Sequence, residues 1–187
     1  MGKTVALVVA AGRGRRFGGD LPKQYARLGG QTVLRRTLCA LLFDDQVDHV
    51  CCVIHPDDED LYAAATEGLD LLPAVHGGAT RQDSVRLGLE SLEAFSPQTV
   101  LIHDAARPFV SSSVIKGVIK ALDTHAGALP ALPVADTLKR GVDGCIAGTV
   151  SREGLYRAQT PQGFRFADIL NAHRSLLGQI SPGVRCG

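Results

Sequence analysis

Residues 4–17 read TVALVVAAGRGRRF, a short apolar run that leads into a glycine loop loaded with arginine. Residues typical of a strand fill Thr4 to Ala10, and Lys23 follows six residues after Phe17. Glycine lets backbone N–H groups approach phosphate oxygens, and guanidinium and ammonium groups neutralise the phosphate charge. The stretch therefore predicts a strand that delivers a polyphosphate-binding loop, although a plain surface turn would also use these glycines.

Two better-known phosphate loops do not match this stretch. The dinucleotide fingerprint G-x-G-x-x-G requires glycine at the position of Phe17 and an acidic residue about twenty positions further on. No Asp or Glu lies between Asp20 and Asp44. The Walker pattern requires Lys and then Ser or Thr after its last glycine, but Gly19 is followed by Asp20 and Leu21. The loop therefore belongs to neither class.

Composition and charge distribution narrow the class of protein. The chain has 187 residues and 45% hydrophobic content, which suits one globular domain with a full core. The net charge is only +1, but residues 1–36 carry eight Lys or Arg against one Asp, whereas residues 37–73 carry nine Asp or Glu and no Lys or Arg. We therefore expect anions to bind near the N-terminal segment. Nucleic acid is not the expected partner, because aromatic residues make up 5% and Trp is absent.

The cysteines and the apolar segments bear on the compartment. Five cysteines are an odd number and form no C-x-x-C pattern, so we predict reduced thiols. Cys51 and Cys52 lie in the apolar run 50–54 and are expected to be buried. The N-terminus has no signal-peptide pattern, and no apolar stretch reaches the length of a membrane span. The expected partners do not include a membrane, and the expected compartment is the cytoplasm.

The order of apolar segments predicts an α/β fold. Short apolar runs at 4–10, 47–54, 71–75, 99–103 and 128–134 are predicted strands, and apolar residues at helical spacing predict helices over 34–42, 85–92 and 114–122. Strands that are apolar on both faces indicate a mostly parallel sheet with helices on both faces. We expect one domain over residues 1–177 and an irregular tail over 178–187. Ligands then bind beyond the carboxyl ends of the strands.

Residues 135–155 interrupt the alternation of strands and helices. Glycines occupy positions 141, 144, 148 and 154, between short apolar pieces. We interpret the segment as a hairpin arm that leaves the domain. An excursion of this kind has little core of its own and tends to pack on another subunit, whereas the alternative is a plain surface loop.

Asp104 and a second glycine turn are the other candidate site elements. The predicted strand that ends at His103 delivers Asp104 to its carboxyl end, where a carboxylate beside a polyphosphate suits Mg²⁺. Helix capping is the alternative role of Asp104, and His103 is expected to be a packed histidine without a chemical role. Residues 77–84 read GGATRQDS, a glycine turn that begins a helix. We expect its N–H groups to face the same ligand-binding edge of the sheet.

Six motifs in order carry a resemblance that covers roughly residues 3–170. They read VVAAGRGRRF, LPKQY, GGATRQDSVRLGL, HDAARPFV, ADTLKR and SREGLYRAQTPQGF. Together they resemble the 2-C-methyl-D-erythritol 4-phosphate cytidylyltransferase family of the non-mevalonate isoprenoid pathway. The resemblance implies a Rossmann-like fold of the nucleotide-diphospho-sugar transferase type with a protruding β-arm. It also implies a homodimeric, magnesium-dependent nucleotidyltransferase in which the sugar phosphate attacks the α-phosphorus of CTP and releases pyrophosphate. A phosphate monoester is already anionic, so alignment and charge neutralisation suffice.

The resemblance also implies residue roles. On the nucleotide side, the catalytic cations Arg16 and Lys23 grip the triphosphate, and Gly12 and Gly14 shape the loop around it. Backbone or hydroxyl groups read cytosine, and they belong to Ala10, Ala11, Gly78 and Ser84. On the other side, Asp104 serves the metal, directly or through water, and the substrate. Arg107 binds the sugar substrate, and Thr137 and Arg152 reach it from the partner's arm, which makes the site composite.

The chain departs from the family after Leu177. Family members continue with a Thr-Asp-acidic segment and a late strand bearing a Lys that faces the substrate phosphate, whereas residues 178–187 read GQISPGVRCG. We therefore expect a fragment or altered product of a cytidylyltransferase. Two alternatives stay open: an enzyme for ribitol 5-phosphate or another polyol phosphate, and a catalytically silent CTP-binding or dimerising fragment. Whether the parent protein is fused to a cyclodiphosphate synthase also stays open.

Overall fold

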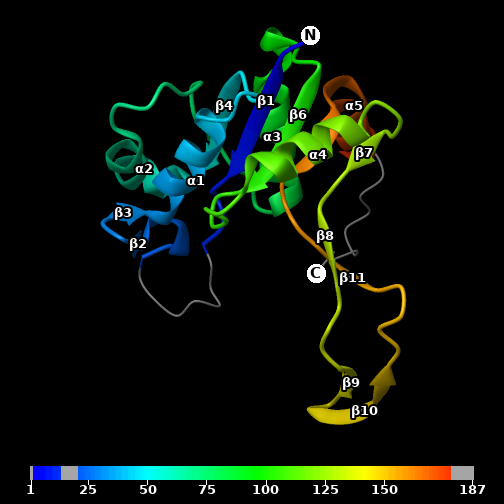
Figure 1. The fold of residues 1–187 in the computed structure, drawn as a ribbon. Helices are drawn as coiled ribbons and strands as arrows, with labels where there is room; N and C mark the ends of the chain where they lie inside the picture. Colours follow the sequence, from blue (N-terminus) through cyan, green and yellow to red (C-terminus); the bar gives the residue numbers. More distant parts are fainter. Residues whose placement is uncertain (1, 14–20, 178–187) are drawn as a thin grey trace.

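A six-stranded sheet forms the centre of the computed structural model, which describes residues 2–13 and 21–177 (Figure 1). The strand order is β5-β4-β1-β6-β12-β7. The first four of these strands run parallel, and β12 runs antiparallel to both of its neighbours. The strands are β1 (Thr4–Val9), β4 (His49–Ile54), β5 (Val75–His76), β6 (Thr99–Asp104), β7 (Gly127–Ala128) and β12 (Gln162–Arg165). The predicted mostly parallel sheet is confirmed.

Helices cover both faces of the sheet because successive residues of each strand face opposite sides. Ala6 and Val8 of β1 pack in one core with α1 (Val33–Leu42), α2 (Glu59–Thr66) and α4 (Ser112–Ala121). Val5 and Leu7 pack in the other core with α3 (Arg81–Ser91) and α5 (Phe166–Leu177). Apolar residues on both faces of β1 are therefore fully buried, as the unbroken apolar run predicts.

The path of the chain places the loops of the site together. From β1 the chain passes through α1 to β4 and then to β5 on one side, whereas β6 pairs with the opposite edge of β1. The strand order therefore reverses between β1 and β6, and ligands of open α/β sheets bind at such a reversal. In the described part of the chain, three short 3-10 helices and a small hairpin complete the body of the fold around the central sheet: η2 (Lys23–Tyr25), η3 (Pro56–Asp58), η4 (Glu93–Phe95), β2 (Arg27–Leu28) and β3 (Gln31–Thr32).

Two strand predictions are wrong in extent, and proline explains both. The run 71–75 forms a ladder only at Val75 and His76, because Pro73 has no N–H to donate. The run 128–134 divides at Pro130 into β7 and β8 (Ala131–Pro133), which belong to different sheets. As a result, β8 lies outside the six-stranded central sheet.

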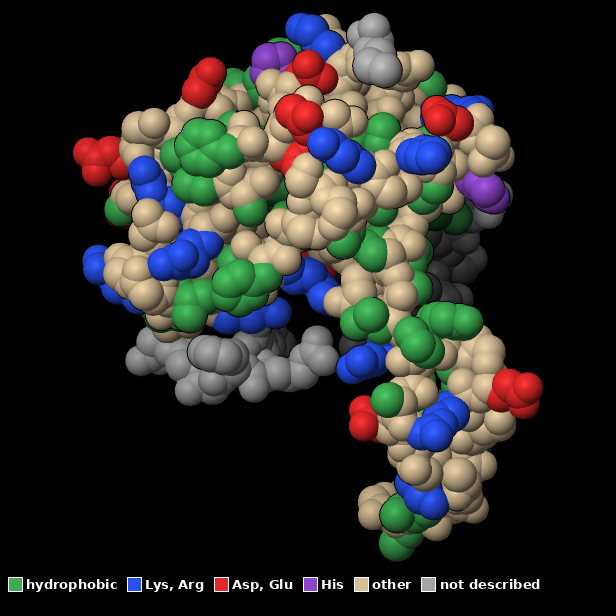
Figure 2. Space-filling view, viewed as in Figure 1, with side chains coloured by type: hydrophobic (Ala, Val, Ile, Leu, Met, Phe, Trp, Pro, Cys, Tyr) green, Lys and Arg blue, Asp and Glu red, His purple; other side chains and the backbone are tan. Residues whose placement is uncertain are grey.

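An arm leaves the body at β8 and returns at β11 (Tyr156–Ala158), its antiparallel partner (Figure 1). Its outer part is the hairpin of β9 (Leu138–Val142) and β10 (Cys145–Val150). The turn consists of Asp143 and Gly144, whose φ angles of 49° and 78° suit a two-residue hairpin loop. Hydrophobic side chains gather at the base and the tip of the arm (Figure 2), and those exposed along it are Leu132, Val142, Ile146, Leu155 and Tyr156.

Candidate active site

A pocket of about 880 Å³ opens where β1, β4 and β6 end. Its wall combines the two glycine loops with the segment that follows β6; the lining residues are 9–13, 23, 24, 55, 78–81, 84 and 104–107. This lining includes four cationic side chains and one carboxylate, namely Arg13, Lys23, Arg81, Arg107 and Asp104. The excess of positive charge suits a polyanion, and the volume suits a nucleotide-sized ligand.

The first glycine loop begins directly at the end of β1. The Ala10 N–H donates to the carbonyl of Val53 at 2.7 Å, so the edge of the sheet extends to the first residue of the loop. Ala10, Ala11 and Gly12 line the pocket, and Lys23 reaches it from η2 as an exposed side chain. The structure thus brings together these four predicted nucleotide residues. Gly14 and Arg16, the other two predicted residues of this loop, lie outside the described residues.

Arg13 is a pocket residue whose role the sequence did not reveal. Its guanidinium donates to Asp58 Oδ1 at 3.0 Å and to His55 Nδ1 at 2.8 Å, and it also pairs with Asp57. His55 Nδ1 accepts the Asp57 N–H as well, so this nitrogen carries no proton. The contacts join the first glycine loop to the turn after β4. In the sequence, the adjacent carboxylates in the run HPDD (residues 55–58) were the signal that could have predicted a partner for Arg13.

The second glycine loop is held by its own helix. Thr80 and Asp83 form a reciprocal capping box at the N-terminus of α3. The buried Ser84 hydroxyl accepts the Gly78 N–H at 3.1 Å and lies 2.9 Å from the Thr80 carbonyl, to which it donates. A Cβ at Gly78 would lie 2.5 Å from Asp83 Cβ, so only glycine fits this approach. Gly78 and Ser84 both line the pocket. The hydroxyl proton of Ser84 is used in the hydrogen bond to the Thr80 carbonyl of this loop.

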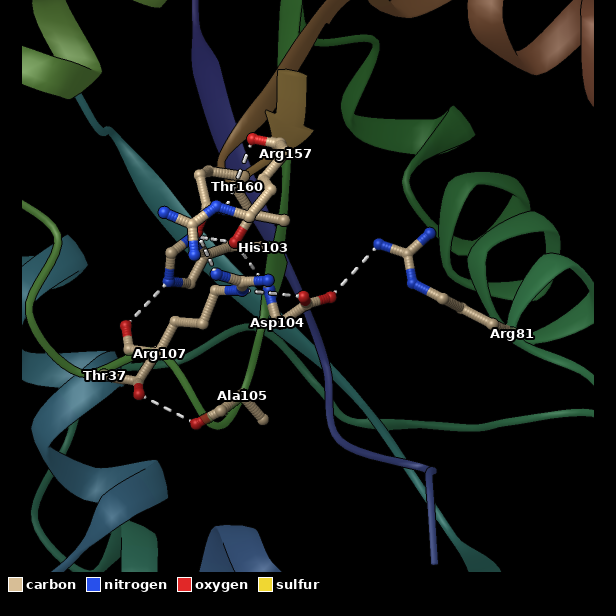
Figure 3. A network of polar contacts seen from close by, with 9 residues as sticks. Thr37, Arg81, His103, Asp104, Ala105, Arg107, Arg157 and Thr160 are labelled. Carbon is tan, nitrogen blue, oxygen red and sulfur yellow. Dashed lines mark hydrogen bonds and ion pairs between the residues drawn. The ribbon is translucent and has the colours of Figure 1, made fainter. Parts of the chain in front are cut away.

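Asp104 sits between two arginines at the end of β6 (Figure 3). Its Oδ1 accepts from Arg81 Nη2 at 3.1 Å, and its Oδ2 accepts from Arg107 Nε at 3.0 Å. Burial alone would raise the pKa of Asp104, but the guanidinium groups of Arg107 and Arg81 outweigh it and hold the pKa below the ordinary 3.8. Asp104 is therefore ionised at neutral pH. The hydrogen-bond partners of its carboxylate are arginines, and it caps none of the described helices.

His103 supports this segment through hydrogen bonds on both ring nitrogens (Figure 3). Its Nε2 donates to the Arg107 carbonyl at 3.0 Å, and this leaves Nδ1 to accept from the Thr160 hydroxyl at 3.1 Å. Thr160 Oγ1 in turn accepts the Asp104 N–H at 3.3 Å. Burial lowers the pKa of His103, so the ring is neutral. It is the packed histidine that the sequence led us to expect. The Arg107 side chain also donates to Gln159, which fixes its direction.

Thr137 and Arg152 lie on the arm, beside the β9–β10 hairpin, and do not belong to the pocket lining of their own chain. Both are exposed, and Arg152 donates to the carbonyl of Ala135 across the base of the β9–β10 hairpin. A single chain therefore gathers Asp104 and Arg107 at the pocket and leaves these two predicted substrate residues apart from it.

The carboxylates of the pocket determine how Mg²⁺ could bind there. Among the described residues, no cluster of three His, Cys, Asp or Glu side chains could hold a metal ion by itself. Asp104 is the one carboxylate among the described lining residues, and each of its oxygens already accepts from an arginine. Mg²⁺ usually keeps several waters and takes one or two carboxylates plus substrate phosphates. The pocket thus fits the ion when a triphosphate supplies the remaining oxygens.

The thiols lie away from this chemistry. Burial raises the pKa of Cys51 to about 11 and that of Cys52 to about 12, so both are protonated at neutral pH. Cys39, Cys51, Cys52 and Cys145 are free thiols in the described part of the chain.

Within residues 2–13 and 21–177, no helix combines the length and the apolar composition needed to cross a membrane.

Comparison with known proteins agrees with the geometry. The family model of IspD, 2-C-methyl-D-erythritol 4-phosphate cytidylyltransferase, matches residues 4–183. The chain belongs to this family. The IspD/IspF bifunctional enzyme of Paramagnetospirillum magneticum is 64% identical over 95% of this chain and 46% of its own length. That of Rhodospirillum rubrum is 62% identical over 96% of this chain and 47% of its own length.

A solved structure of the IspD family has the same fold. The 2-C-methyl-D-erythritol 4-phosphate cytidylyltransferase of Thermus thermophilus superposes with a TM-score of 0.77 at 35% identity, over the whole of this chain and 80% of that chain. By contrast, the chain spans about half the length of the curated bifunctional IspD/IspF relatives that it matches.

Proposed function

We propose that the protein is a cytidylyltransferase that joins CTP and 2-C-methyl-D-erythritol 4-phosphate. The products are 4-diphosphocytidyl-2-C-methyl-D-erythritol and pyrophosphate, in isoprenoid precursor biosynthesis. The observation that carries this proposal is the pocket in which the first glycine loop, Lys23 and the Asp104–Arg107 pair meet at the reversal of the strand order. Membership of the family and the printed names of the relatives support it.

The reaction is an in-line displacement at the α-phosphorus of CTP. One sugar-phosphate oxygen forms the new P–O bond, and the bond to the leaving pyrophosphate breaks. The attacking phosphate is already anionic, so catalysis consists of alignment and charge neutralisation. Lys23 would grip the triphosphate together with Arg16, while Gly12 and Gly14 shape the loop around it. Lys23 is well suited because it is a pocket residue with an exposed ammonium group.

On the nucleotide side, cytosine would be read by groups near Ala10, Ala11 and Gly78, with Ser84 shaping the second loop. The Ser84 hydroxyl already holds Gly78 and Thr80, so its contribution to base recognition acts chiefly through the loop geometry. On the sugar side, Arg107 would bind the sugar substrate, with the direction of its side chain set by Asp104 and Gln159.

The proposed cofactor is Mg²⁺, which neutralises phosphate charge when bound. Asp104 would hold it, directly or through water, because it is the carboxylate among the described residues of the pocket lining. The proposed assembly is a homodimer through the arm, in which Thr137 and Arg152 reach the partner's pocket. The exposed apolar side chains along the arm support this assembly. We place the reaction in the cytoplasm.

Pyrophosphate release by the purified protein tests the proposal. With CTP and Mg²⁺, we expect turnover of 2-C-methyl-D-erythritol 4-phosphate and much slower turnover of ribitol 5-phosphate. Lys23→Ala and Arg16→Ala should each reduce kcat by about 100-fold to 1,000-fold, the typical loss for one preorganised charge-stabilising donor. Lys120→Ala, a change of another exposed lysine outside the pocket, serves as the matched control.

The pattern of turnover decides between the candidate functions. Faster turnover of ribitol 5-phosphate would assign the other polyol phosphate as substrate. CTP binding without turnover of either compound would favour a silent nucleotide-binding module.

A further inference from the structure

Gln24 is a buried polar side chain beneath the first glycine loop. It is 2% exposed, and its Nε2 donates to the carbonyl of Ala10 at 2.7 Å and to the carbonyl of Gly12 at 3.2 Å. Backbone carbonyls only accept hydrogen bonds, so the amide nitrogen must face them and the orientation of the side chain is settled. One side chain therefore holds two carbonyls of the pocket wall, those of Ala10 and Gly12, which belong to residues two positions apart.

These two contacts determine where the N–H groups of the loop point. In a trans peptide the C=O and N–H bonds point in opposite directions. Drawing the carbonyls of Ala10 and Gly12 toward Gln24 therefore turns the N–H groups of Ala11 and Arg13 away from it. Ala11 and Arg13 line the pocket, and no acceptor for either N–H is found within residues 2–13 and 21–177.

Gln24 also shares its turn with a predicted catalytic residue. It follows Lys23 in η2, and the turn closes with the Tyr25 N–H donating to the Pro22 carbonyl at 2.9 Å. Lys23 is exposed at the pocket, whereas Gln24 and Tyr25 are buried. Docking of Gln24 on the loop thus sets the position of the lysine relative to the loop N–H groups.

We propose that Gln24 is a positioning residue for nucleotide binding, which holds the N–H groups of Ala11 and Arg13 toward the phosphates of the nucleotide. The inference rests on the proposed function, because it names CTP as the occupant of the pocket. Gln24 acts through the loop and touches no reacting atom. Its amide satisfies the buried carbonyl of Ala10 and the partly buried carbonyl of Gly12, which would otherwise be free to turn and carry the N–H groups with them.

Two substitutions separate this role from simple support of the fold. Gln24→Glu keeps the shape of the side chain but sets carboxylate oxygens against two carbonyl oxygens, and Gln24→Met keeps the length but removes the donor. We expect the Kd and KM for CTP to rise about tenfold to 100-fold, since a misplacement near 1 Å can cost about 100-fold. The KM for the sugar phosphate should change less than about twofold, because Gln24 holds only the nucleotide side.

Arg35→Met is the matched control. The Arg35 side chain also donates to two backbone carbonyls, those of Ala65 and Glu67, at 3.0 and 2.9 Å, but it lies outside the pocket lining. Its removal should lower the unfolding midpoint and leave the Kd for CTP unchanged. Equal rises in the KM values of both substrates in the Gln24 variants would reveal a general loss of structure and would overturn the inference.

NMR on the wild-type protein tests the inference without any variant. The amide protons of Ala11 and Arg13 should shift in the NMR spectrum, and become protected from exchange, when CTP is added. Unchanged amides in a protein that binds CTP, or a Gln24→Met protein with the wild-type Kd, would overturn the positioning role alone. A wild-type protein that does not bind CTP would contradict the proposed function itself.

Discussion

The guanidinium group of Arg81, on the first turn of α3, lies 3.1 Å from the carboxylate of Asp104 at the end of β6 (Figure 3). The contact joins the second glycine loop to the segment that carries Arg107, which binds the same carboxylate. All three side chains are about one-third to one-half exposed, so the ion pairs contribute little to the free energy of unfolding. Their consequence is orientation: one carboxylate sets the direction of two cations at the pocket.

Replacing Asp104 by Asn should make stability less dependent on pH in the acid range. The folded pKa of Asp104 lies below its ordinary 3.8, so its ionised form stabilises the fold above that pH and this contribution is lost as the pH falls through the folded pKa. Urea unfolding should show wild type more stable than Asp104→Asn by at most about 1 kcal/mol at pH 7. The difference should shrink as the pH falls below 3.8 toward the folded pKa; a difference that grows on acidification would contradict the assignment.

His103 should make the protein less stable as the pH falls below neutrality. Burial holds its folded pKa below 6.5, so the unfolded chain takes up a proton first, and stability declines as the pH falls below 6.5 toward the folded pKa. His103→Gln should flatten this decline in thermal melts between pH 7 and pH 5. The exposed His125→Gln is the control. A residual slope is expected from His173, whose pKa burial also lowers, whereas an unaltered slope in His103→Gln would refute the prediction.

Two helical glycines should respond in opposite ways to alanine. A Cβ at Gly88 in α3 would lie 2.6 Å from Val53 and 2.7 Å from Leu7, so Gly88→Ala overpacks the contact of the helix with the sheet and should cost about 1–3 kcal/mol. A Cβ at Gly117 in α4 would meet nothing within 4 Å, so Gly117→Ala should stabilise by about 0.4–1 kcal/mol. Denaturant titration measures both, and equal effects would show that packing does not distinguish these sites.

Mixing two inactive variants tests the composite site. Lys23→Ala should damage the pocket, and Arg152→Ala should damage the arm that serves the partner's pocket. A heterodimer of the two variants has one site in which an intact pocket meets an intact arm. Random mixing in equal amounts should therefore restore about a quarter of wild-type activity. No recovery in mixtures that exchange subunits would indicate that Arg152 acts within its own chain.

The exposed apolar side chains of the arm should be needed for dimerisation. Ile146 is 71% exposed at the β9–β10 hairpin, so Ile146→Asp removes an apolar contact without a cost to the core. We expect sedimentation to show the monomer at concentrations at which wild type is a dimer. Phe43→Asp, at an apolar side chain that follows α1 and is 81% exposed, is the control and should leave the dimer intact. Monomeric wild-type protein at all concentrations would contradict the proposed assembly.

Much of the architecture could be predicted because it depends on local patterns. Apolar runs that alternate with helical spacing require a covered, mostly parallel sheet, since each strand has to bury both faces. The placement of Asp104 at a strand end followed from the same reasoning. The errors in extent came at Pro73 and Pro130, where a missing N–H ends a ladder that hydrophobicity alone would extend.

By itself, the sequence determined the chemistry of the pocket: glycines for close backbone approach, cations for phosphate, and one strand-end carboxylate. The tertiary structure alone decided which distant groups hold these residues in place. Asp58 holds Arg13, Gln24 holds two carbonyls of the loop, and Asp104 is shared by Arg81 and Arg107. A periodic pattern reports which face of an element is buried. It carries no information on which polar groups meet, because those contacts arise only when loops from separate strands converge at one edge of the sheet.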